Sequence, residues 1–315
     1  MKKFDQLAYY VSISHLYRWK TLRTNELISN LHTKNMSLSE FFENIDDKDF
    51  CDDFNLKTNE VADLQKAKKD IPNNSFLVED LLDQGFDIIP ITSDRYPNNL
   101  KVNLKKRYSP PILYTKGDLS MLNEEKIAIV GSRDANEISI KFTKNIARNA
   151  VENSQVIVSG FAKGTDRMAL DSALDNKGKS IIVLPQGIKT FSTGFKKYYS
   201  QIIEGDVLVL STFHPNVPWS VGLAMARNTY IYGLANAIYV SQSANKGGTW
   251  SGVVNGLKRD REIYVRMSKE NEDNANNQLI SKGAIPIDIE GNVMELKESK
   301  DSKKSQVKVK QIEIF

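Results

Sequence analysis

From residue 126 onward the chain alternates short apolar runs with longer stretches of mixed apolar and polar positions. The apolar runs are rich in Val, Ile and Leu, which is typical of strands that are buried on both faces of a sheet. They predict strands at residues 126–130, 155–159, 180–184, 206–211, 237–241, 262–266 and 284–289. The stretches between them, such as residues 138–151 and 165–174, have the apolar spacing of helices. This alternation predicts an α/β fold with a doubly wound, mostly parallel sheet.

The first 65 residues have a different pattern, which predicts a small N-terminal helical domain. Apolar positions within residues 4–45 recur at helical spacing, and Ser37 and Glu40 have the spacing of a capping box at a helix start. Residues 43–63 contain eight acidic residues and two lysines. Such a charged segment predicts a solvated linker after the helices.

The remaining segments complete the expected organisation. A helix over residues 76–84 and a strand over residues 87–91 lead into the sheet domain, which we expect over residues 75–290. Residues 291–315 form a basic C-terminal tail. The net charge of the whole chain is only +4, so a site for a polyanion must be a local patch within the fold.

Glycine, hydroxyl and cationic residues follow the predicted strands. Gly131-Ser132-Arg133 follows the first strand of the sheet domain, and the run from Ser159 to Gly164 follows the second. Three further loops of this kind are Pro185-Gln186-Gly187, the segment ending at Arg227-Asn228, and Lys246-Gly247-Gly248-Thr249-Trp250. Glycines let backbone N–H groups approach an anion, and hydroxyls and cations bind phosphate oxygens. Because parallel strands end at one edge of a sheet, the loops predict a site there for a ligand with several phosphates.

Composition narrows the chemistry. Hydrophobic residues make up 40% of the 315 positions and charged residues 26%, as in ordinary globular proteins. The single Cys51 and three scattered histidines argue against a disulfide, a metal site and a histidine-dependent triad. We expect a cytoplasmic protein, because no signal peptide or membrane-spanning segment is apparent. The loops lack the P-loop and dehydrogenase glycine patterns, so no cofactor is expected.

Taken together, these motifs resemble a known family. Gly131-Ser132-Arg133, the run from Ser159 to Asp166 and the segment starting at Arg227-Asn228 are similar to the DNA-processing protein A family, called DprA or Smf. The similarity covers roughly residues 75–290, and the helical N-terminus resembles the SAM-like domain of that family. It implies an extended Rossmann-like fold, single-stranded DNA as the ligand, a homodimer and delivery of the DNA to a RecA-like recombinase.

The resemblance also implies which residues bind DNA. These are Gly131, Ser132, Arg133, Ser159, Gly160, Lys163, Gly164, Arg227, Asn228, Gly247, Gly248 and Thr249. Ser132, Arg133, Lys163 and Arg227 would contact phosphates. Asp166, the only carboxylate within these motifs, is expected to accept hydrogen bonds from N–H groups at a helix start.

Three aromatic residues lie in or near the predicted site. Phe161 and Trp250 belong to the strand-end loops and are candidates for stacking on a base, and the alternative is that each packs between its loop and the sheet. Trp219, in a proline-rich loop after the fourth predicted strand, has the same two alternatives.

The chain departs from the usual pattern of the family in several places. Phe161, Thr165 and Thr229 stand where other residues are usual, and the residues after Ile289 leave no room for the C-terminal winged-helix domain of many members. We therefore expect a divergent member, for which phage defence beside an effector or toxin protein is an alternative to natural transformation.

Two other functions use the same superfamily fold. Phosphoribohydrolases have a P-G-G-x-G-T-x-x-E motif, and here Gly252 stands where their glutamate is expected, in the run Gly247-Gly248-Thr249-Trp250-Ser251-Gly252. Without that carboxylate no residue is evident for general acid or base catalysis, so we expect a binding protein with no catalytic residues. A sensor of a small nucleotide is the third alternative.

Overall fold

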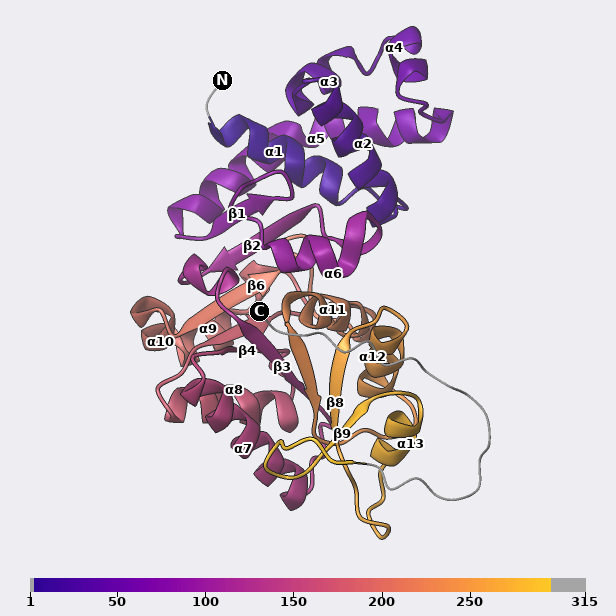
Figure 1. Ribbon diagram of the computed structural model, residues 1–315. Helices are drawn as coiled ribbons and strands as arrows, with labels where there is room; N and C mark the ends of the chain where they lie inside the picture. Colours follow the sequence, from indigo (N-terminus) through magenta and orange to yellow (C-terminus); the bar gives the residue numbers. More distant parts are fainter. Residues whose placement is uncertain (1–2, 296–315) are drawn as a thin grey trace, which may run out of the picture.

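A nine-stranded mixed sheet forms the centre of the protein (Figure 1). The computed structural model describes residues 3–295, so most of the predicted basic tail lies outside the described residues. The strand order is β1-β2-β6-β5-β4-β3-β7-β8-β9. The strands are β1 (Asp87–Pro90), β2 (Ile112–Lys116), β3 (Lys126–Val130), β4 (Val156–Ser159), β5 (Ser180–Val183), β6 (Val207–Ser211), β7 (Ala237–Val240), β8 (Glu262–Arg266) and β9 (Ile285–Ile287).

The seven strands from β6 to β9 in this order are parallel, whereas β1 and β2 extend the β6 edge as antiparallel strands. All seven strands predicted from residue 126 onward are confirmed, with ends that differ by one or two residues. The predicted doubly wound, mostly parallel α/β fold is therefore confirmed. Sequence analysis did not predict β2.

Helices cover both faces of the parallel strands because alternate strand residues are buried on opposite sides. On β3, Ile127 and Ile129 pack against α7 (Glu137–Glu152) and α8 (Thr165–Asp175). Ala128 and Val130 belong to the cluster on the other face. That cluster also contains residues of α6 (Asn98–Tyr108), α11 (Val221–Leu234), α12 (Gly248–Leu257) and α13 (Asn276–Ser281).

Shorter elements complete the sheet domain near the β6 edge. They are two 3₁₀ turns, η1 (Leu119–Leu122) and η2 (Ile188–Thr190), and two short helices, α9 (Ser192–Lys197) and α10 (Tyr199–Glu204). Phe191 and Tyr198 from this region join a core cluster with residues of α1 and α5, so these short helices help to fasten the N-terminal helices to the sheet.

Five helices precede or flank the first strand and form a region at the top of Figure 1. They are α1 (Lys3–Ser14), α2 (Thr21–Thr33), α3 (Leu38–Asn44), α4 (Lys48–Asp53) and α5 (Thr58–Asp83). The predicted capping box is confirmed: the Ser37 hydroxyl accepts from the Glu40 N–H, and the Glu40 carboxylate accepts from the Ser37 N–H. The expected domain boundary at residue 65 falls within α5.

The predicted linker over residues 43–63 is wrong. This segment contains α4 and the first turns of α5, and Cys51, Phe54 and Leu56 are buried in a core cluster with residues of α2 and α3. Asp47 caps α4 by accepting from the Phe50 N–H at 3.1 Å. The acidic residues occupy the solvated faces and caps of short amphipathic helices, so counting charges hid the apolar positions between them.

Within residues 3–295, no helix combines the length and the apolar character needed to cross a bilayer.

A pair of histidines joins the helical region to the sheet. His15, directly after α1, has its Nε2 atom 3.0 Å from the Tyr114 hydroxyl on β2, and its ring lies edge-on to His214 at 5.3 Å between centroids. Burial, and to a lesser extent the nearby His214 ring, lowers the pKa of His15 from its ordinary value of 6.5 to about 3. His15 is therefore neutral in the folded protein at mildly acidic pH.

The free energy of unfolding should consequently fall as the pH drops below 6.5. His15 becomes protonated near that pH in the unfolded chain, whereas in the folded protein it stays neutral until the pH approaches 3. We expect a loss of about 1 kcal/mol from this group between pH 7.5 and 5.5, measured by urea unfolding. His15→Gln should reduce that pH dependence. Equal pH dependence in the wild type and His15→Gln would contradict the assignment.

Candidate functional site

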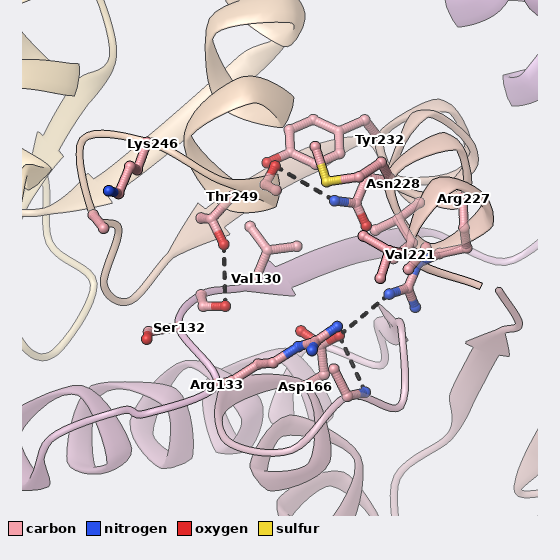
Figure 2. Close-up of a pocket in the computed structure, with 17 residues that line it drawn as sticks. Val130, Ser132, Arg133, Asp166, Val221, Arg227, Asn228, Tyr232, Lys246 and Thr249 are labelled. Atoms are coloured by element: carbon pink, nitrogen blue, oxygen red, sulfur yellow. Dashed lines mark hydrogen bonds and ion pairs between the residues drawn. The ribbon is translucent and has the colours of Figure 1, made fainter. Parts of the chain in front are cut away.

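The main candidate site is a cavity of about 340 Å³ at the carboxyl ends of the central strands (Figure 2). It lies where the strand order reverses, since β4 pairs with one side of β3 and β7 with the other. Loops diverge at such a point and leave a recess above the sheet. The lining residues are Val130, Gly131, Ser132, Arg133, Ala162, Asp166, Val221, Ala224, Met225, Arg227, Asn228, Ile231, Tyr232, Ala244, Lys246, Gly248 and Thr249.

Neighbouring segments hold the loop after β3 in place. The Thr249 hydroxyl donates to the Gly131 carbonyl at 3.1 Å, and the Thr165 N–H and hydroxyl both point to the Ser132 carbonyl at 3.2 Å. The next side chain, Arg133, is exposed and forms no hydrogen bond or ion pair within the described residues. It extends along the cavity toward Asp166 in Figure 2. The loop is thus anchored through its carbonyls, and its cation faces solvent.

The loop after β4 approaches the rest of the site too closely for larger residues. An ideal Cβ on Gly160 would lie 1.6 Å from Nη1 of Arg227, so the Arg227 side chain occupies the space that a β-carbon would fill. Gly164 has a φ of 85°, and a Cβ there would lie 2.4 Å from the Arg133 carbonyl oxygen. These two glycines let the two loops and α11 meet around one cavity.

A buried pair of charges lies beneath the cavity. Arg227 on α11 donates from Nη1 to the Val183 carbonyl at 3.0 Å, and its Nη2 lies 4.0 Å from the Asp166 carboxylate on α8. Asp166 also accepts from the Ala162 N–H at 3.4 Å, as expected for an acid at a helix start. Burial raises the pKa of Asp166, and Arg227 acts in the opposite direction. Arg227 stays charged, since a guanidinium remains protonated even when burial lowers its pKa.

Two polar residues of α11 form another wall. Asn228 donates to the Gly248 carbonyl at 3.4 Å, which links α11 to the start of α12. Tyr232, one helical turn later, is 6% exposed, and its hydroxyl has no hydrogen-bond partner within the described residues. A buried hydroxyl without a partner is costly unless a ligand or water bonds to it. Tyr232 is therefore a candidate donor to a bound anion.

The prediction that the strand-end loops gather at one edge is confirmed for four of the five loops at this cavity. The third loop contributes Pro185 and Gln186 to an adjoining cavity of about 230 Å³, which Lys163 also lines. Ser159 is buried and donates to the Ile129 carbonyl at 3.3 Å, so it braces the strands. Gly247 is exposed at the turn before α12.

Both aromatic candidates in these loops pack against protein groups. The Phe161 ring lies 3.7 Å from the Arg167 guanidinium and 4.9 Å from the Phe191 centroid. Trp250 packs on the core cluster, with Lys282 5.8 Å from its ring centroid. The geometry favours the packing alternative for both rings.

Sequence reasoning did not select Tyr232 or Lys246 as site residues, although both line the main cavity. A signal for Tyr232 was present, because residues four apart on a helix share a face and Asn228 was already a candidate. Lys246 lay within a loop that was recognised for its glycines.

These features can be compared with those of known proteins. The family model described as DNA recombination-mediator protein A matches residues 87–297. The chain belongs to this family. The resemblance found in the motifs is therefore confirmed.

Over the aligned residues, individual members are between a quarter and a third identical to this chain. It is 32% identical over 183 residues to DNA processing protein DprA from Streptococcus pneumoniae and 29% identical over 185 residues to that from Bacillus subtilis. Each alignment covers 58% of this chain, and they cover 63% and 61% of the two relatives, so the chain spans about three fifths of the length of these curated relatives.

Two solved structures extend the comparison. DprA from Streptococcus pneumoniae aligns with a TM-score of 0.74 and 25% identity, over 91% of this chain and 95% of that one. DNA processing protein A from Helicobacter pylori, described for its single-stranded DNA binding mode, aligns with a TM-score of 0.54 and 27% identity, over 64% of this chain and 90% of that one. The first alignment includes the N-terminal helical region, since it covers nearly the whole chain.

The close contact at Gly160 gives a stability prediction. Gly160→Ala should displace Arg227 from Asp166 and lower the free energy of unfolding by about 2 kcal/mol or more, because a buried charge loses its geometry and the core is overpacked. Urea unfolding measures the loss. Gly222→Ala is the matched control: the nearest atom to a Cβ there is 3.9 Å away, so this variant should be as stable as the wild type or slightly more stable. Equal stability of Gly160→Ala and Gly222→Ala would contradict the packing described.

Proposed function

We propose that this protein binds single-stranded DNA through its phosphates at the strand-end cavity, as a DNA-processing protein of its family. The observation that carries the proposal is the set of exposed cations around the cavity. Arg133 and Lys246 line it, and Lys163 lines the adjoining one. The one carboxylate in the cavity, Asp166, is compensated by Arg227. The exposed charge is therefore positive, which favours a polyanion.

The shape of the site supports a single strand over a duplex. The cavity is a recess between loops, and the exposed cations Arg133 and Lys246 line that recess. A flexible strand can place one phosphate in the recess and direct its bases outward, whereas a stiff duplex presents phosphates on a convex surface. The solved relative from Helicobacter pylori, whose study concerns single-stranded DNA, supports the same ligand.

Within this proposal the four predicted phosphate-binding residues have different roles. Arg133 and Lys163 are exposed and contact phosphates directly, and Ser132 adds a hydroxyl at the edge of the cavity. Arg227 is 4% exposed and bonded to protein groups, so its role is to hold the floor of the cavity. The unpartnered Tyr232 hydroxyl is an additional donor.

The same family membership supports the wider expectations. We propose that the protein acts in the cytoplasm, as a homodimer that passes the bound strand to a RecA-like recombinase. Size-exclusion chromatography with light scattering tests the dimer. A pull-down with purified recombinase, with and without oligonucleotide, tests the transfer step.

The geometry disfavours a phosphoribohydrolase. At Gly252, where those enzymes have their glutamate, an ideal Cβ would lie 2.9 Å from the Tyr232 hydroxyl, so a longer side chain would collide with a buried ring. Asp166 is held by Arg227 and the Ala162 N–H, which leaves it poorly placed to exchange protons with a substrate. The described cavity therefore supports binding and not hydrolysis.

The binding proposal predicts that the affinity for a labelled single-stranded oligonucleotide falls steeply with salt between about 50 and 200 mM, and exceeds that for a duplex. Arg133→Ala and Lys163→Ala should each weaken binding by about tenfold or more through loss of a charge-assisted contact, measured by fluorescence anisotropy. Lys144→Ala, which removes an exposed lysine of α7, is the charge-matched control, and its affinity for the oligonucleotide should be closer to that of the wild type. Salt-independent binding or a preference for duplex would disprove the proposal.

We also predict that the protein does not release free base from nucleoside monophosphates, because no suitably placed general acid or base lines the cavity. Incubation with the common ribonucleotides followed by chromatography tests this. Base release that is abolished in Arg133→Ala would identify an enzyme instead.

A further inference from the structure

An exposed tryptophan lies beside the proposed phosphate site. Trp219, which precedes α11, has 47% of its surface exposed and lines the adjoining cavity together with Lys163 and Gln186. That cavity and the main one share Arg133, Ala162, Ala224 and Arg227 as lining residues. The indole and the phosphate-binding cations therefore belong to one continuous surface.

The loop that carries Trp219 is held firmly. The Gly187 N–H donates to the Val217 carbonyl at 2.8 Å, and the Val217 N–H donates to the His214 carbonyl at 2.9 Å. The Lys189 N–H donates to the Pro215 carbonyl at 3.1 Å, and an ideal Cβ on Gly187 would lie 2.2 Å from that same oxygen. Proline at positions 215 and 218 restricts the backbone further. The backbone that carries the ring is thus held in place, which lowers the entropy lost when a ligand binds.

Trp219 also differs from the other rings on this surface in having no aromatic or cationic partner among the described residues. Phe161 and Phe191 contact each other and further groups, whereas Trp219 makes no ring–ring or cation–π contact within residues 3–295. Val221 and Met225, which line the main cavity, are 67% and 42% exposed. Together with Trp219 they form an apolar edge next to the cations, an arrangement that suits a ligand with alternating apolar rings and charges.

We propose that Trp219 is a base-stacking platform for the strand whose phosphate is held at Arg133. This inference rests on the proposed function and adds a subsite to it. Bases of every kind have a flat face, so stacking on an indole adds affinity without sequence preference. The cations bind the backbone inside the cavities, and the base turns outward onto the ring.

Affinity measurements with two oligonucleotides test the subsite. One is a short oligothymidylate, and the other has the same length but abasic sites in place of its bases. Trp219→Ala should weaken binding of the oligothymidylate by about five- to 100-fold, the range found for loss of a stacked base, and should bind the abasic strand as the wild type does. Trp219→Phe should recover most of the affinity because it keeps a ring.

Intrinsic fluorescence gives an independent measurement. The chain has three tryptophans, and oligothymidylate should quench the wild type and Trp250→Phe but quench Trp219→Phe far less. Phe76→Ala, which removes a 71% exposed ring from α5, is the control for loss of an exposed aromatic group and should leave affinity unchanged. Melting temperatures confirm that each variant is folded.

The outcomes separate the two proposals. If the wild type binds single strands but Trp219→Ala binds both oligonucleotides as tightly as the wild type, the stacking inference is wrong and the proposed function stands. Equal weakening on both oligonucleotides also overturns stacking, since the lost contact is then with the backbone. If the wild type binds neither oligonucleotide, the proposed function fails and the stacking inference fails with it. A role of Trp219 in protein docking instead would appear as loss of recombinase binding with unchanged DNA affinity.

Discussion

The strand-end cavity depends on the buried pair of Asp166 and Arg227. These side chains come from α8 and α11, which flank the cavity, and the Arg227 guanidinium also bonds the end of β5 and fills the space beside Gly160. Two charges that leave water must compensate each other and find hydrogen bonds. The pair therefore links the two helices, and the exposed cations of the proposed site are Arg133, Lys163 and Lys246.

The order of the strands explains why the site lies where it does. In the sheet, β3 lies between β4 and β7. In the chain, β4 follows β3 directly, whereas β7 comes only after β4, β5 and β6. The loops after these strands turn away from one another, and α11 closes the recess with Asn228 and Tyr232. The central strands β3, β4, β5 and β6 are buried along their whole length, and this sheet holds the loops within short distances of one another.

In the proposed binding mode, the two adjoining cavities and their apolar edge recognise different parts of a nucleic acid. The phosphates would bind to the cations that line the two cavities. The apolar faces of the bases would lie outside, on the edge formed by Trp219, Val221 and Met225. The proposed contacts involve phosphates and base faces and no base edge, so binding in this mode would not depend on the sequence of the DNA. This fits a protein whose family acts in DNA processing and recombination.

The sequence by itself determined the parallel sheet, because strands buried on both faces need continuous apolar runs, and it determined the strand-end loops through their glycines and hydroxyls. It did not determine that residues 43–63 are helical, since their acids hide which face is buried. Only the tertiary structure decided that Arg227 is compensated by Asp166, that the Phe161 ring is occupied by Arg167 and Phe191, and that Trp219 remains exposed. Whether a side chain is free to contact a ligand depends on residues that are far away in the chain and that come close to it only when the protein folds.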